Sequence, residues 1–498
     1  MHKVDTSDAK SEGSVLVQDL VHIGRHGQEP GLHMRRSRLG FSVAGCILVS
    51  LIWIACRNAG EPNPVPCGDG SQVNLGPNVG AVTEHTAKIW IRSCSPNTVA
   101  AQYKTASQSW DDNSVIQTEW VSTDPAADHT AVIHLTNLAA ATRHDYRIVT
   151  RGESTNVDEG QFKTMPDQGV GSVVTFTIGS DLHLPYLRYS SIFDAVSERE
   201  PDFALLIGDT VDAEPAPWVS ETPVPIPESA ADYEKLYRES FSLEPFRSFL
   251  SNTPTFFSWD DHEILDDWDE GVRSPYGWAR TAYEEYANSV NPPPRASGGL
   301  NYSFQAGDVE FYVLDTRTFR SPGATPDGPA KTMLGPVQKQ DLLTWLLTST
   351  SRFKLVVSSV MWNDFSIHID LGESWPSYKT ERDEILDFIR DNGIPGVVLI
   401  SGDEHWAGAF KLSPWGIYEV APGPMNWPLD ATTADDPQIL FKQAWTSVFG
   451  YFVVDTTVCP GELSIRIVDA ENVVRFELSL SELDLMPVAQ KEHAGLCP

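Results

Sequence analysis

Four short apolar segments are each followed directly by a group of acidic residues and histidines, and this recurrence constrains the fold more than any other feature. The segments are Val173–Ile178, Phe203–Ile207, Thr255–Ser258 and Val397–Ile400. The groups that follow them read GSDLH from Gly179, GDTVD from Gly208, WDDHE from Trp259 and SGDEH from Ser401. Uncharged runs of this length, rich in β-branched and aromatic residues, predict buried strands.

Helical patterns separate these strands. They cover Ser190–Glu200, Ala231–Leu250, Ala279–Ser289, Gln338–Thr348 and Glu381–Asp391. Two further strands are predicted at Glu310–Leu314 and Lys354–Val360. Strand–helix alternation predicts an α/β layered fold. Because ligands of such folds bind beyond the carboxyl ends of the strands, we expect the four polar groups to meet in one site.

Near the carboxyl terminus, three segments alternate apolar and polar residues in the manner of edge strands. They are Gly450–Asp455, Glu462–Val468 and Val473–Leu480. We expect them to complete one sheet without contributing to the chemistry.

Residues 70–166 have a different pattern, in which turn-forming residues separate short segments of strand character. The segments lie at 80–82, 87–91, 99–103, 129–135 and 145–149. Regular spacing of this kind predicts a β-sandwich. The stretch from Leu138 to Ile148 resembles the end of a fibronectin type III-like module. The predicted organisation is a fibronectin- or immunoglobulin-like β-sandwich over 70–166, followed by an α/β domain over 167–485.

The amino terminus has the character of a targeting segment. Residues 39–56 contain no charge and follow a basic stretch that includes Arg35 and Arg36, which predicts a signal peptide or a membrane anchor. The chain is therefore expected to be exported, with its catalytic domain in the periplasm or outside the cell. Cys56 ends a segment that resembles a lipoprotein signal. Residues 1–38 are a cytoplasmic tail or a mis-assigned start, and residues 57–69 a linker.

Four of the six cysteines lie beyond the targeting segment. Two disulfides among them suit an oxidising compartment, and three pairings are open. The most local pairing joins Cys67 to Cys94 and Cys459 to Cys497. Free thiols are the alternative.

The charge balance excludes one class of partner. The chain carries 68 acidic and 36 basic residues, a formal net charge of -32. Such a surface repels nucleic-acid backbones, and no nucleic-acid-binding surface is evident. A phosphate ester would also be repelled at long range, so a site for one needs local positive charge, which bound metal ions supply.

The residue types at the four strand ends suit metal ions. Carboxylates and imidazoles are ligands of divalent and ferric ions. Such ions polarise a phosphoryl group and lower the pKa of a bound water. A pair of ions roughly 3.5–4 Å apart stabilises both the attacking and the leaving oxygen of an in-line displacement. The sequence therefore predicts a site for two or more metal ions.

These groups resemble the ordered motifs of the calcineurin-like metallophosphatase superfamily, and within it the alkaline phosphatase D (PhoD-like) family. Further matching segments are Pro201-Asp202-Phe203, Leu314-Asp315-Thr316-Arg317-Thr318-Phe319-Arg320 and Leu334-Gly335 with Gln338 and Trp345-Leu346. The resemblance covers about residues 70–485. It implies a calcineurin-like layered α/β sandwich that hydrolyses phosphoric esters with a metal-activated hydroxide.

The resemblance implies a role for each matching residue. Asp181, His183 and His405 would bind a first metal, and Asp209 would bridge to a second. Asp261 and Asp403 would complete the second site. His262 would stabilise the transition state or protonate the leaving oxygen.

Other roles remain open. Asp212, Asp260 and Asn363 are candidate further ligands, although Asp364 and His368 compete with Asn363. Arg317 is a candidate phosphate contact, with a structural ion pair as the alternative.

The chain also departs from a pattern seen in part of the family. A Cys-Gln pair in the first motif and a tyrosine after the bridging aspartate are replaced by Asp181-Leu182-His183 and Asp212. A purple ferric centre is therefore not expected. The carboxylate-rich ligand set favours Mn, Fe or Ca over Zn, and the identity of the ions stays open.

The leading hypothesis is hydrolysis of phosphoric mono- or diesters. A non-catalytic surface binding protein that retains a hydrolase fold is the alternative from another class, and hydrolysis of another ester is a third.

Overall fold

The computed structural model describes residues 73–111, 113–152, 158–185, 191–214, 225–269, 275–366, 372–429 and 435–487. The predictions for residues 1–38, 39–56 and 57–69 therefore lie outside the described residues. Within the described ranges, no helix has the length and apolar character needed to cross a membrane. Cys94 and Cys459 are both disulfide-bonded. Their predicted partners, Cys67 and Cys497, lie outside the described ranges, so the pairing stays a prediction.

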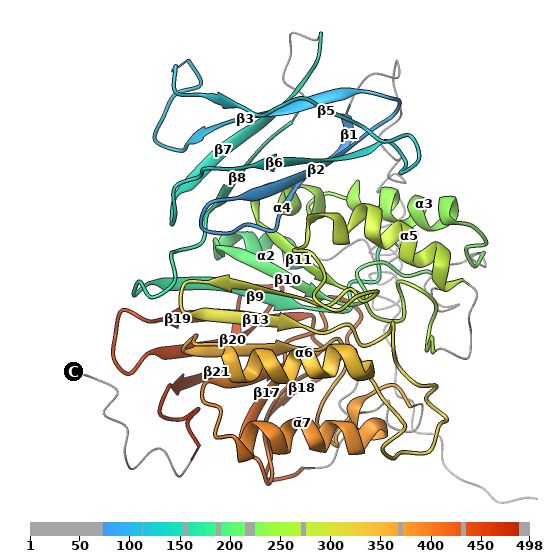
Figure 1. The fold of residues 1–498 in the computed structure, drawn as a ribbon, viewed down its shortest axis with the longest axis vertical. Helices are drawn as coiled ribbons and strands as arrows, with labels where there is room; N and C mark the ends of the chain where they lie inside the picture. Colours follow the sequence, from blue (N-terminus) through green and yellow to red (C-terminus); the bar gives the residue numbers. More distant parts are fainter. Residues whose placement is uncertain are drawn as a thin grey trace, which may run out of the picture. The chain divides into compact units, whose positions relative to one another are not determined.

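The first described part is the predicted β-sandwich, built from two antiparallel sheets (Figure 1). One sheet contains β1 (Val73–Gly80), β2 (Ala87–Ser93) and β6 (Thr130–Leu135). The other contains β3 (Thr98–Thr105), β4 (Ile116–Gln117), β5 (Val121–Ser122), β7 (Arg143–Thr150) and β8 (Glu159–Lys163). Strand β7 buries every second residue, the period-2 alternation that a half-buried strand requires.

The second part contains two larger sheets. The first has the order β11-β10-β9-β19-β20-β21. Its strands are β9 (Val173–Gly179), β10 (Phe203–Ile207), β11 (Thr255–Ser258), β19 (Val448–Asp455), β20 (Glu462–Asp469) and β21 (Val474–Ser481). Strands β9, β10 and β11 are parallel neighbours, so their carboxyl ends share one edge.

The second large sheet has the order β12-β13-β14-β15-β17-β16-β18. Its strands are β12 (Tyr302–Ala306), β13 (Val309–Val313), β14 (Phe353–Val357), β15 (Val397–Ile400), β16 (Ala407–Leu412), β17 (Ile417–Ala421) and β18 (Ile439–Gln443). Strands β13, β14, β15 and β17 run parallel.

Helices cover the outer faces of the two sheets. Buried residues of α2 (Ile192–Glu198), α3 (Ala230–Phe241), α4 (Phe246–Asn252) and α5 (Tyr276–Tyr286) share an apolar cluster with the first large sheet. Those of α6 (Gly335–Thr348) and α7 (Lys379–Asp391) share one with the second (Figure 1). Short 3-10 helices lie at η1 (Asn288–Val290) and η3 (Trp375–Tyr378). The result is the predicted layered α/β sandwich.

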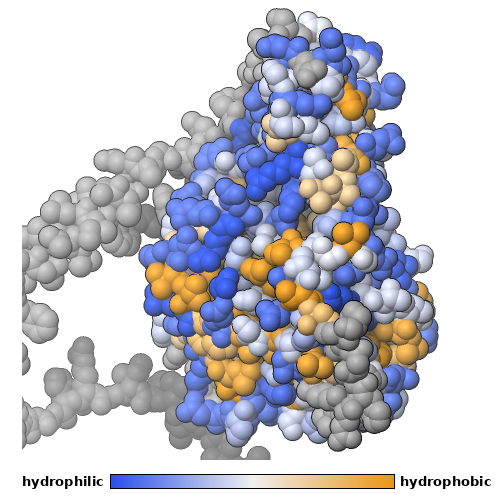
Figure 2. Space-filling view, turned by 90° about the vertical axis from the view of Figure 1, so that its left-hand side faces the viewer, coloured by the Kyte–Doolittle hydropathy of each residue, from blue (hydrophilic) through white to orange (hydrophobic). Residues whose placement is uncertain are grey.

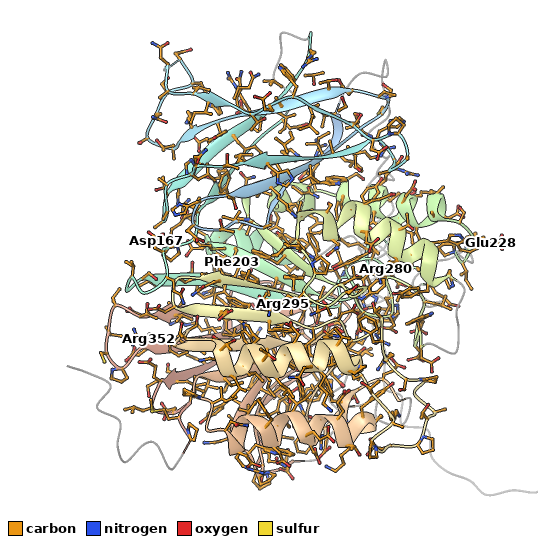
Figure 3. The ribbon with its side chains drawn as sticks, viewed as in Figure 1. Asp167, Phe203, Glu228, Arg280, Arg295 and Arg352 are labelled. Carbon is orange, nitrogen blue, oxygen red and sulfur yellow. The ribbon has the colours of Figure 1, made fainter. Side chains whose placement is uncertain are left out.

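Aromatic side chains fill the space between the two sheets. Phe203 of the first sheet lies with its ring centroid 5.1 Å from that of Phe176 and 5.5 Å from that of Phe311 of the second sheet (Figure 3). Phe452 stacks on Phe176 from the other side at 4.9 Å. Phe176 contacts the other three rings, and this aromatic packing joins the two sheets, so that strand ends from both can contribute to one site.

Two predictions about elements were wrong. The single helix expected at 231–250 is two helices, α3 and α4, because Pro245 has no N–H to continue the first and instead precedes the second. The segment expected as an edge strand at 450–455 is β19, which pairs with both β9 and β20 inside the first sheet. Strands β12, β16, β17 and β18 were not predicted.

The β-sandwich is fixed to the α/β domain by buried hydrogen bonds. The hydroxyl of Tyr146 donates to the carbonyl of Ser251 at 2.8 Å, and the indole of Trp90 donates to the carbonyl of Glu285 at 2.8 Å. Both donors come from sandwich strands, and both acceptors come from helices of the α/β domain. The two parts therefore form one packed body.

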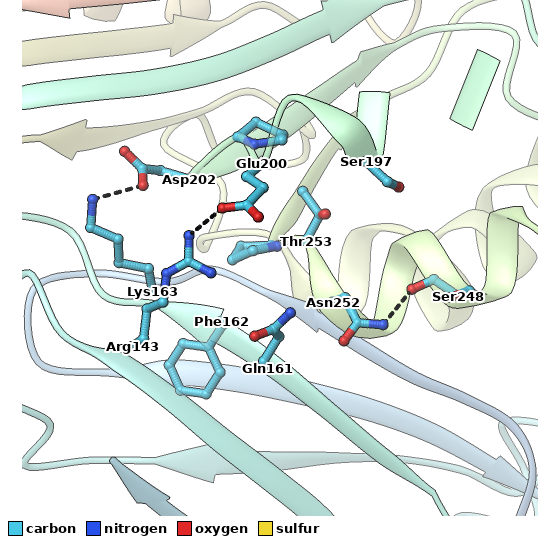
Figure 4. A pocket seen from close by; sticks show the side chains of 12 residues that line it. Arg143, Gln161, Phe162, Lys163, Ser197, Glu200, Asp202, Ser248, Asn252 and Thr253 are labelled. Carbon is cyan, nitrogen blue, oxygen red and sulfur yellow. Dashed lines mark hydrogen bonds and ion pairs between the residues drawn. The ribbon is translucent and has the colours of Figure 1, made fainter. Parts of the chain in front are cut away.

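A polar cleft of about 380 Å³ lies along this interface (Figure 4). Ion pairs cross it between Arg143 and Glu200 at 3.2 Å and between Lys163 and Asp202 at 2.8 Å. The cleft adjoins the amino ends of β10 and β11, opposite the edge that carries the predicted chemistry. We therefore interpret it as part of the domain interface.

The exterior agrees with the charged composition. The face drawn in Figure 2 is mostly hydrophilic, with separate hydrophobic patches. Among the exposed large apolar side chains, Trp445 has the highest exposed fraction, 67%.

The buried hydrogen bond of Tyr146 should stabilise the interface. Replacing Tyr146 with Phe leaves the Ser251 carbonyl buried without this donor, which we expect to cost about 1–3 kcal/mol of unfolding free energy. Urea unfolding would measure it as a lower midpoint at unchanged slope. Tyr103→Phe is the control, because the Tyr103 hydroxyl bonds to Thr136 in a partly exposed position. Equal midpoints for the two variants would contradict this role.

Candidate metal centre

The structure brings the four predicted strand-end groups together. The carboxyl ends of β9, β10 and β11 in one sheet and of β15 in the other carry them. Among the described residues, five overlapping groups of acidic residues and histidines have ligand atoms within 4.8 Å of one another, and two of these groups contain the six predicted ligands. The first contains Asp181, His183 and His405, and the second contains Asp209, Asp260, Asp261 and Asp403. All seven residues are buried.

The first set is rich in histidine. The rings of His183 and His405 stack with centroids 5.1 Å apart, and Nε2 of His405 lies 4.0 Å from a carboxylate oxygen of Asp181. The backbone carbonyl of Trp427 lies 3.0 Å from Nδ1 of His405. That contact leaves Nε2 of His405 to face Asp181 and the site.

The second set consists of carboxylates. Asp209 also has ligand atoms within 4.8 Å of those of His262, whose backbone N–H donates to Asp209 at 3.4 Å. Asp261 and Asp209 therefore each face both His262 and the remaining carboxylates. Four buried carboxylates in such proximity repel one another strongly unless cations neutralise them.

One arginine balances part of this charge. Arg317 has no exposed surface and contacts three carboxylates through its guanidinium. Its Nε bonds to Asp260, one Nη bonds to Glu373 and the other lies 3.2 Å from Asp261. Because all three nitrogens face protein carboxylates, the structure favours the ion-pair alternative over the predicted phosphate contact.

Asp212 connects two histidines. One of its carboxylate oxygens lies 3.3 Å from Nδ1 of His183 and the other 3.2 Å from Nδ1 of His262. Both oxygens therefore face imidazole nitrogens, and Nε2 of each ring points elsewhere. A carboxylate in this position fixes the tautomer and orientation of both rings, which is the role of an outer-shell partner and differs from the predicted role of a metal ligand.

Asn363 is committed to other contacts. Its amide donates to Glu419 at 2.9 Å, and its oxygen accepts the N–H of Phe365 at 2.8 Å. Asp364 pairs with Arg382 at 2.6 Å and is largely exposed. His368 lies outside the described residues. The contacts of Asn363 therefore favour a structural role.

The backbone of the site is unusual in a way that the sequence did not indicate. Asp181, His183, Asp209, Asp403 and His405 all have positive φ angles, between 51° and 72°. Non-glycine residues rarely adopt this conformation, and it persists where surrounding contacts enforce it. Here the N–H groups of residues 182 and 183 both donate to the carbonyl of Asp209 at 2.9 Å. These bonds join the first two strand ends directly.

Glu263 joins the next two strand ends, a role that no local sequence pattern indicated. Its buried carboxylate accepts the backbone N–H groups of Asp209, Thr210 and Asp260 at 3.0, 2.7 and 2.8 Å. The end of β10 is thereby fixed to the end of β11. Because its oxygens already accept three N–H groups, Glu263 holds candidate ligands in place without facing the site itself.

A further loop at the site was also missed. Residues 422–429 follow β17, and backbone N–H groups of Met425 and Asn426 donate to the carbonyls of Ser180 and Asp181 at 2.9 and 3.1 Å. The indole of Trp427 contacts the rings of His183 and His405. A Gly-Pro pair directly after an apolar run was the only available signal for this strand end.

Burial and neighbouring charges set the protonation of the carboxylates. Burial raises the pKa of Asp209 and of Asp403 well above the ordinary range, and neighbouring carboxylates add to the effect. Burial also acts on Asp261, but Arg317 and His262 outweigh it and lower its pKa to about 2. Without added positive charge, only part of this set can therefore ionise.

The two linked histidines differ in charge. Burial lowers the pKa of His183 to about 4, despite the hydrogen bond to Asp212, so its ring is neutral and able to act as a ligand. Burial also opposes protonation of His262, but the carboxylates of Asp261, Asp212 and Asp209 outweigh it and raise the pKa well above the usual value. His262 is therefore the proton-carrying member of the pair.

The donor set fits metal ions. Several buried atoms find no hydrogen-bond partner among the described residues. Those that belong to the two ligand sets include Nε2 of His183 and one carboxylate oxygen each of Asp209, Asp260 and Asp403. Buried polar atoms are normally hydrogen-bonded, and their orphaned state here marks positions where a cation would provide the missing partner.

Comparison with known proteins identifies the family. A sequence model described as PhoD-like phosphatase matches residues 177–435, more than half of the chain. The chain belongs to this family. A second model, described as a domain of unknown function (DUF7800), matches residues 70–167, which contain the β-sandwich.

Individual relatives agree with the family. Alkaline phosphatase D of Bacillus subtilis (strain 168) is 24% identical over 326 residues, which cover 58% of this chain and 55% of that protein. The solved structure of PhoD has a TM-score of 0.68 at 18% identity and covers 82% of this chain and 93% of that one. A purple acid phosphatase from seeds of yellow lupin (Lupinus luteus) has a TM-score of 0.59 at 12% identity, covering 86% and 77%. The two structures share the fold of this chain.

Asp212 offers a test of the site's construction. Asp212→Asn keeps the shape of the side chain, but its NH2 group cannot accept a hydrogen bond from the N–H of the second imidazole. We expect the affinity for Mn²⁺ or Ca²⁺ to fall about 10- to 100-fold, as is usual when an outer-shell partner is lost.

Calorimetric titration of the metal-free protein would measure this change. Asp194→Asn, the same substitution at an exposed position of α2, should bind as the unmodified protein does. Unchanged affinity in Asp212→Asn would show that the imidazoles are held by other contacts.

Proposed function

We propose that the protein is a metal-dependent hydrolase of phosphoric mono- or diesters. The observation that supports this most is the second ligand set, four buried carboxylates beside a histidine-rich set at the edge of a PhoD-like fold. An acidic surface would repel an anionic ester, and bound cations would reverse the sign of the charge where the ester must dock.

Two sets of residues would hold the ions. Asp181, His183 and His405 would bind one, and the four carboxylates of the second set would bind another, with Asp209 as the candidate bridge. When bound, the ions would draw charge from the phosphoryl oxygens and acidify a water molecule. The carboxylate-rich second set favours Mn, Fe or Ca.

The remaining residues would handle protons and orientation. Neighbouring carboxylates outweigh burial and raise the pKa of His262 well above its usual value. Its Nδ1 faces Asp212, and its backbone N–H donates to Asp209. These contacts support the role of stabilising the phosphoryl group or giving a proton to the leaving oxygen. Asp212 would keep the ring oriented. Arg317 would pair with Asp260 and keep Asp261 ionised while it stays buried.

We also propose that the protein is exported and tethered to a membrane through residues 39–56. Disulfide bonding at Cys94 and Cys459 supports an oxidising compartment, in which such bonds persist. A surface binding protein with an inactive hydrolase fold is the competing function. The complete set of candidate ligands, each buried and facing the site, favours a working centre.

The direct test is hydrolysis of p-nitrophenyl phosphate and bis-p-nitrophenyl phosphate. The purified protein would be treated with chelator and assayed after addition of Mn, Fe, Ca or Zn. We expect turnover to need metal and to fall more than about 100-fold in Asp209→Asn, because the candidate bridging ligand is lost. The ratio of the two rates would show which ester class is preferred.

Asp194→Asn is the matched control, since it makes the same chemical change on the exposed surface of α2. It should keep the unmodified rate. Folded, metal-loaded protein with no turnover on either ester would overturn the hydrolase proposal and favour the binding-protein alternative.

A further inference from the structure

The indole of Trp427 packs against the two histidine rings of the first ligand set. Its ring centroid lies 4.9 Å from that of His183 and 5.4 Å from that of His405, with interplanar angles of 68° and 66°. Its own carbonyl holds Nδ1 of His405. Among the described residues, no other tryptophan, tyrosine or phenylalanine makes ring contacts with both imidazoles.

The position of this side chain is fixed by its loop. Met425 and Asn426, directly before Trp427, bond to the carbonyls of Ser180 and Asp181 at the end of β9. After it, the N–H of Leu429 donates to the carbonyl of His405 at 2.7 Å. The chain is thus tied to ligand-bearing segments on both sides of the indole, which is held in a pre-organised position.

Close packing of the same loop limits its movement. A side chain at Gly423 would lie 2.3 Å from the hydroxyl of Ser180, so the backbone there is in direct contact with the end of β9. Trp427 itself has a φ of 47°, a conformation that surrounding contacts must enforce. Trp427 is only partly buried, although its indole contacts two candidate ligands.

The chemistry around the indole is otherwise polar. The second ligand set and Asp212 offer carboxylates, and the first offers two imidazoles and Asp181. The phosphate group of an ester is anionic and binds cations, whereas its organic group needs other contacts. An indole provides a broad apolar and π-electron surface, which suits a planar aromatic group.

We propose that Trp427 is a specificity-determining residue that contacts the organic group of the phosphate ester and favours esters with an aromatic ring near the phosphorus. This inference rests on the proposed function, because it assigns part of the same site to the same substrate. Trp427 would contribute to binding and orientation and take no part in proton transfer.

Ring-bearing and ring-free ligands test the proposal. The kcat/KM for phenyl phosphate and methyl phosphate, or for the matching diesters if diesters are preferred, would be measured for the metal-loaded protein, Trp427→Leu and Trp427→Phe. Comparing each variant with the unmodified protein on the same substrate cancels the different intrinsic reactivity of the two esters. In Trp427→Leu we expect the phenyl ester to lose roughly 3- to 10-fold more than the methyl ester, the size of one aromatic contact. Trp427→Phe should retain most of the preference.

A binding measurement separates this proposal from the hydrolase proposal. Phenylphosphonate and methylphosphonate would be titrated into the metal-loaded protein, which requires no turnover. Selective weakening of phenylphosphonate binding in Trp427→Leu would support the subsite even if no ester were hydrolysed. Trp445→Leu, which removes an exposed tryptophan from the loop before β19, should leave both affinities unchanged.

Equal losses for phenyl and methyl ligands in Trp427→Leu would overturn the proposal. That result would mean that the indole acts only by positioning His183 and His405. Equal binding of the two phosphonates by the unmodified protein would overturn it as well, because the site would then have no preference for an aromatic ring.

Discussion

Mutual repulsion among buried carboxylates is the constraint on which the site depends. Two like charges about 4 Å apart interact by about 4 kcal/mol at an effective dielectric constant of about 20. Asp209, Asp260, Asp261 and Asp403 have ligand atoms within 4.8 Å of one another, and Arg317 supplies a single positive charge. A fold that keeps such a set buried must leave part of it protonated or bind cations, and the buried atoms without partners mark where cations would lie. The acidic surface makes the same ions necessary for an anionic substrate.

The fold maintains this set by holding strand ends rigidly. Phenylalanines pack β13 of the second sheet against β9 and β10 of the first, and Val398 and Ile400 of β15 belong to the same apolar cluster. Backbone bonds from residues 182 and 183 to Asp209 join the first two ends, and Glu263 joins the end of β10 to that of β11. Five candidate ligands adopt the left-handed backbone conformation in this arrangement, which costs backbone strain. The loop before β18 adds Trp427, whose indole contacts the rings of His183 and His405. In our proposal, the same indole contacts the organic group of the substrate.

Much of this could be predicted from local patterns. Strands Phe203–Ile207, Thr255–Ser258 and Val397–Ile400 were predicted with both bounds correct, because buried parallel strands are short uncharged runs. Their polar ends identified the site. Pro245 indicates a break between two helices, but the helical periodicity of residues 231–250 was given more weight. Asp212 and Arg317 could not be assigned, since whether a charged side chain faces a ligand or another side chain depends on neighbours far along the chain. Trp427 was missed for the same reason, because nothing local distinguishes it from a core tryptophan.

The central claim is that the buried carboxylates and histidines form a site for at least two ions. Elemental analysis of the purified protein, combined with anomalous diffraction from its crystals, tests this most directly. The account predicts at least two ions for each chain, one among Asp181, His183 and His405 and one among the four carboxylates. Folded protein that holds no ion at either set, even after incubation with Mn, Fe, Ca and Zn, would contradict it.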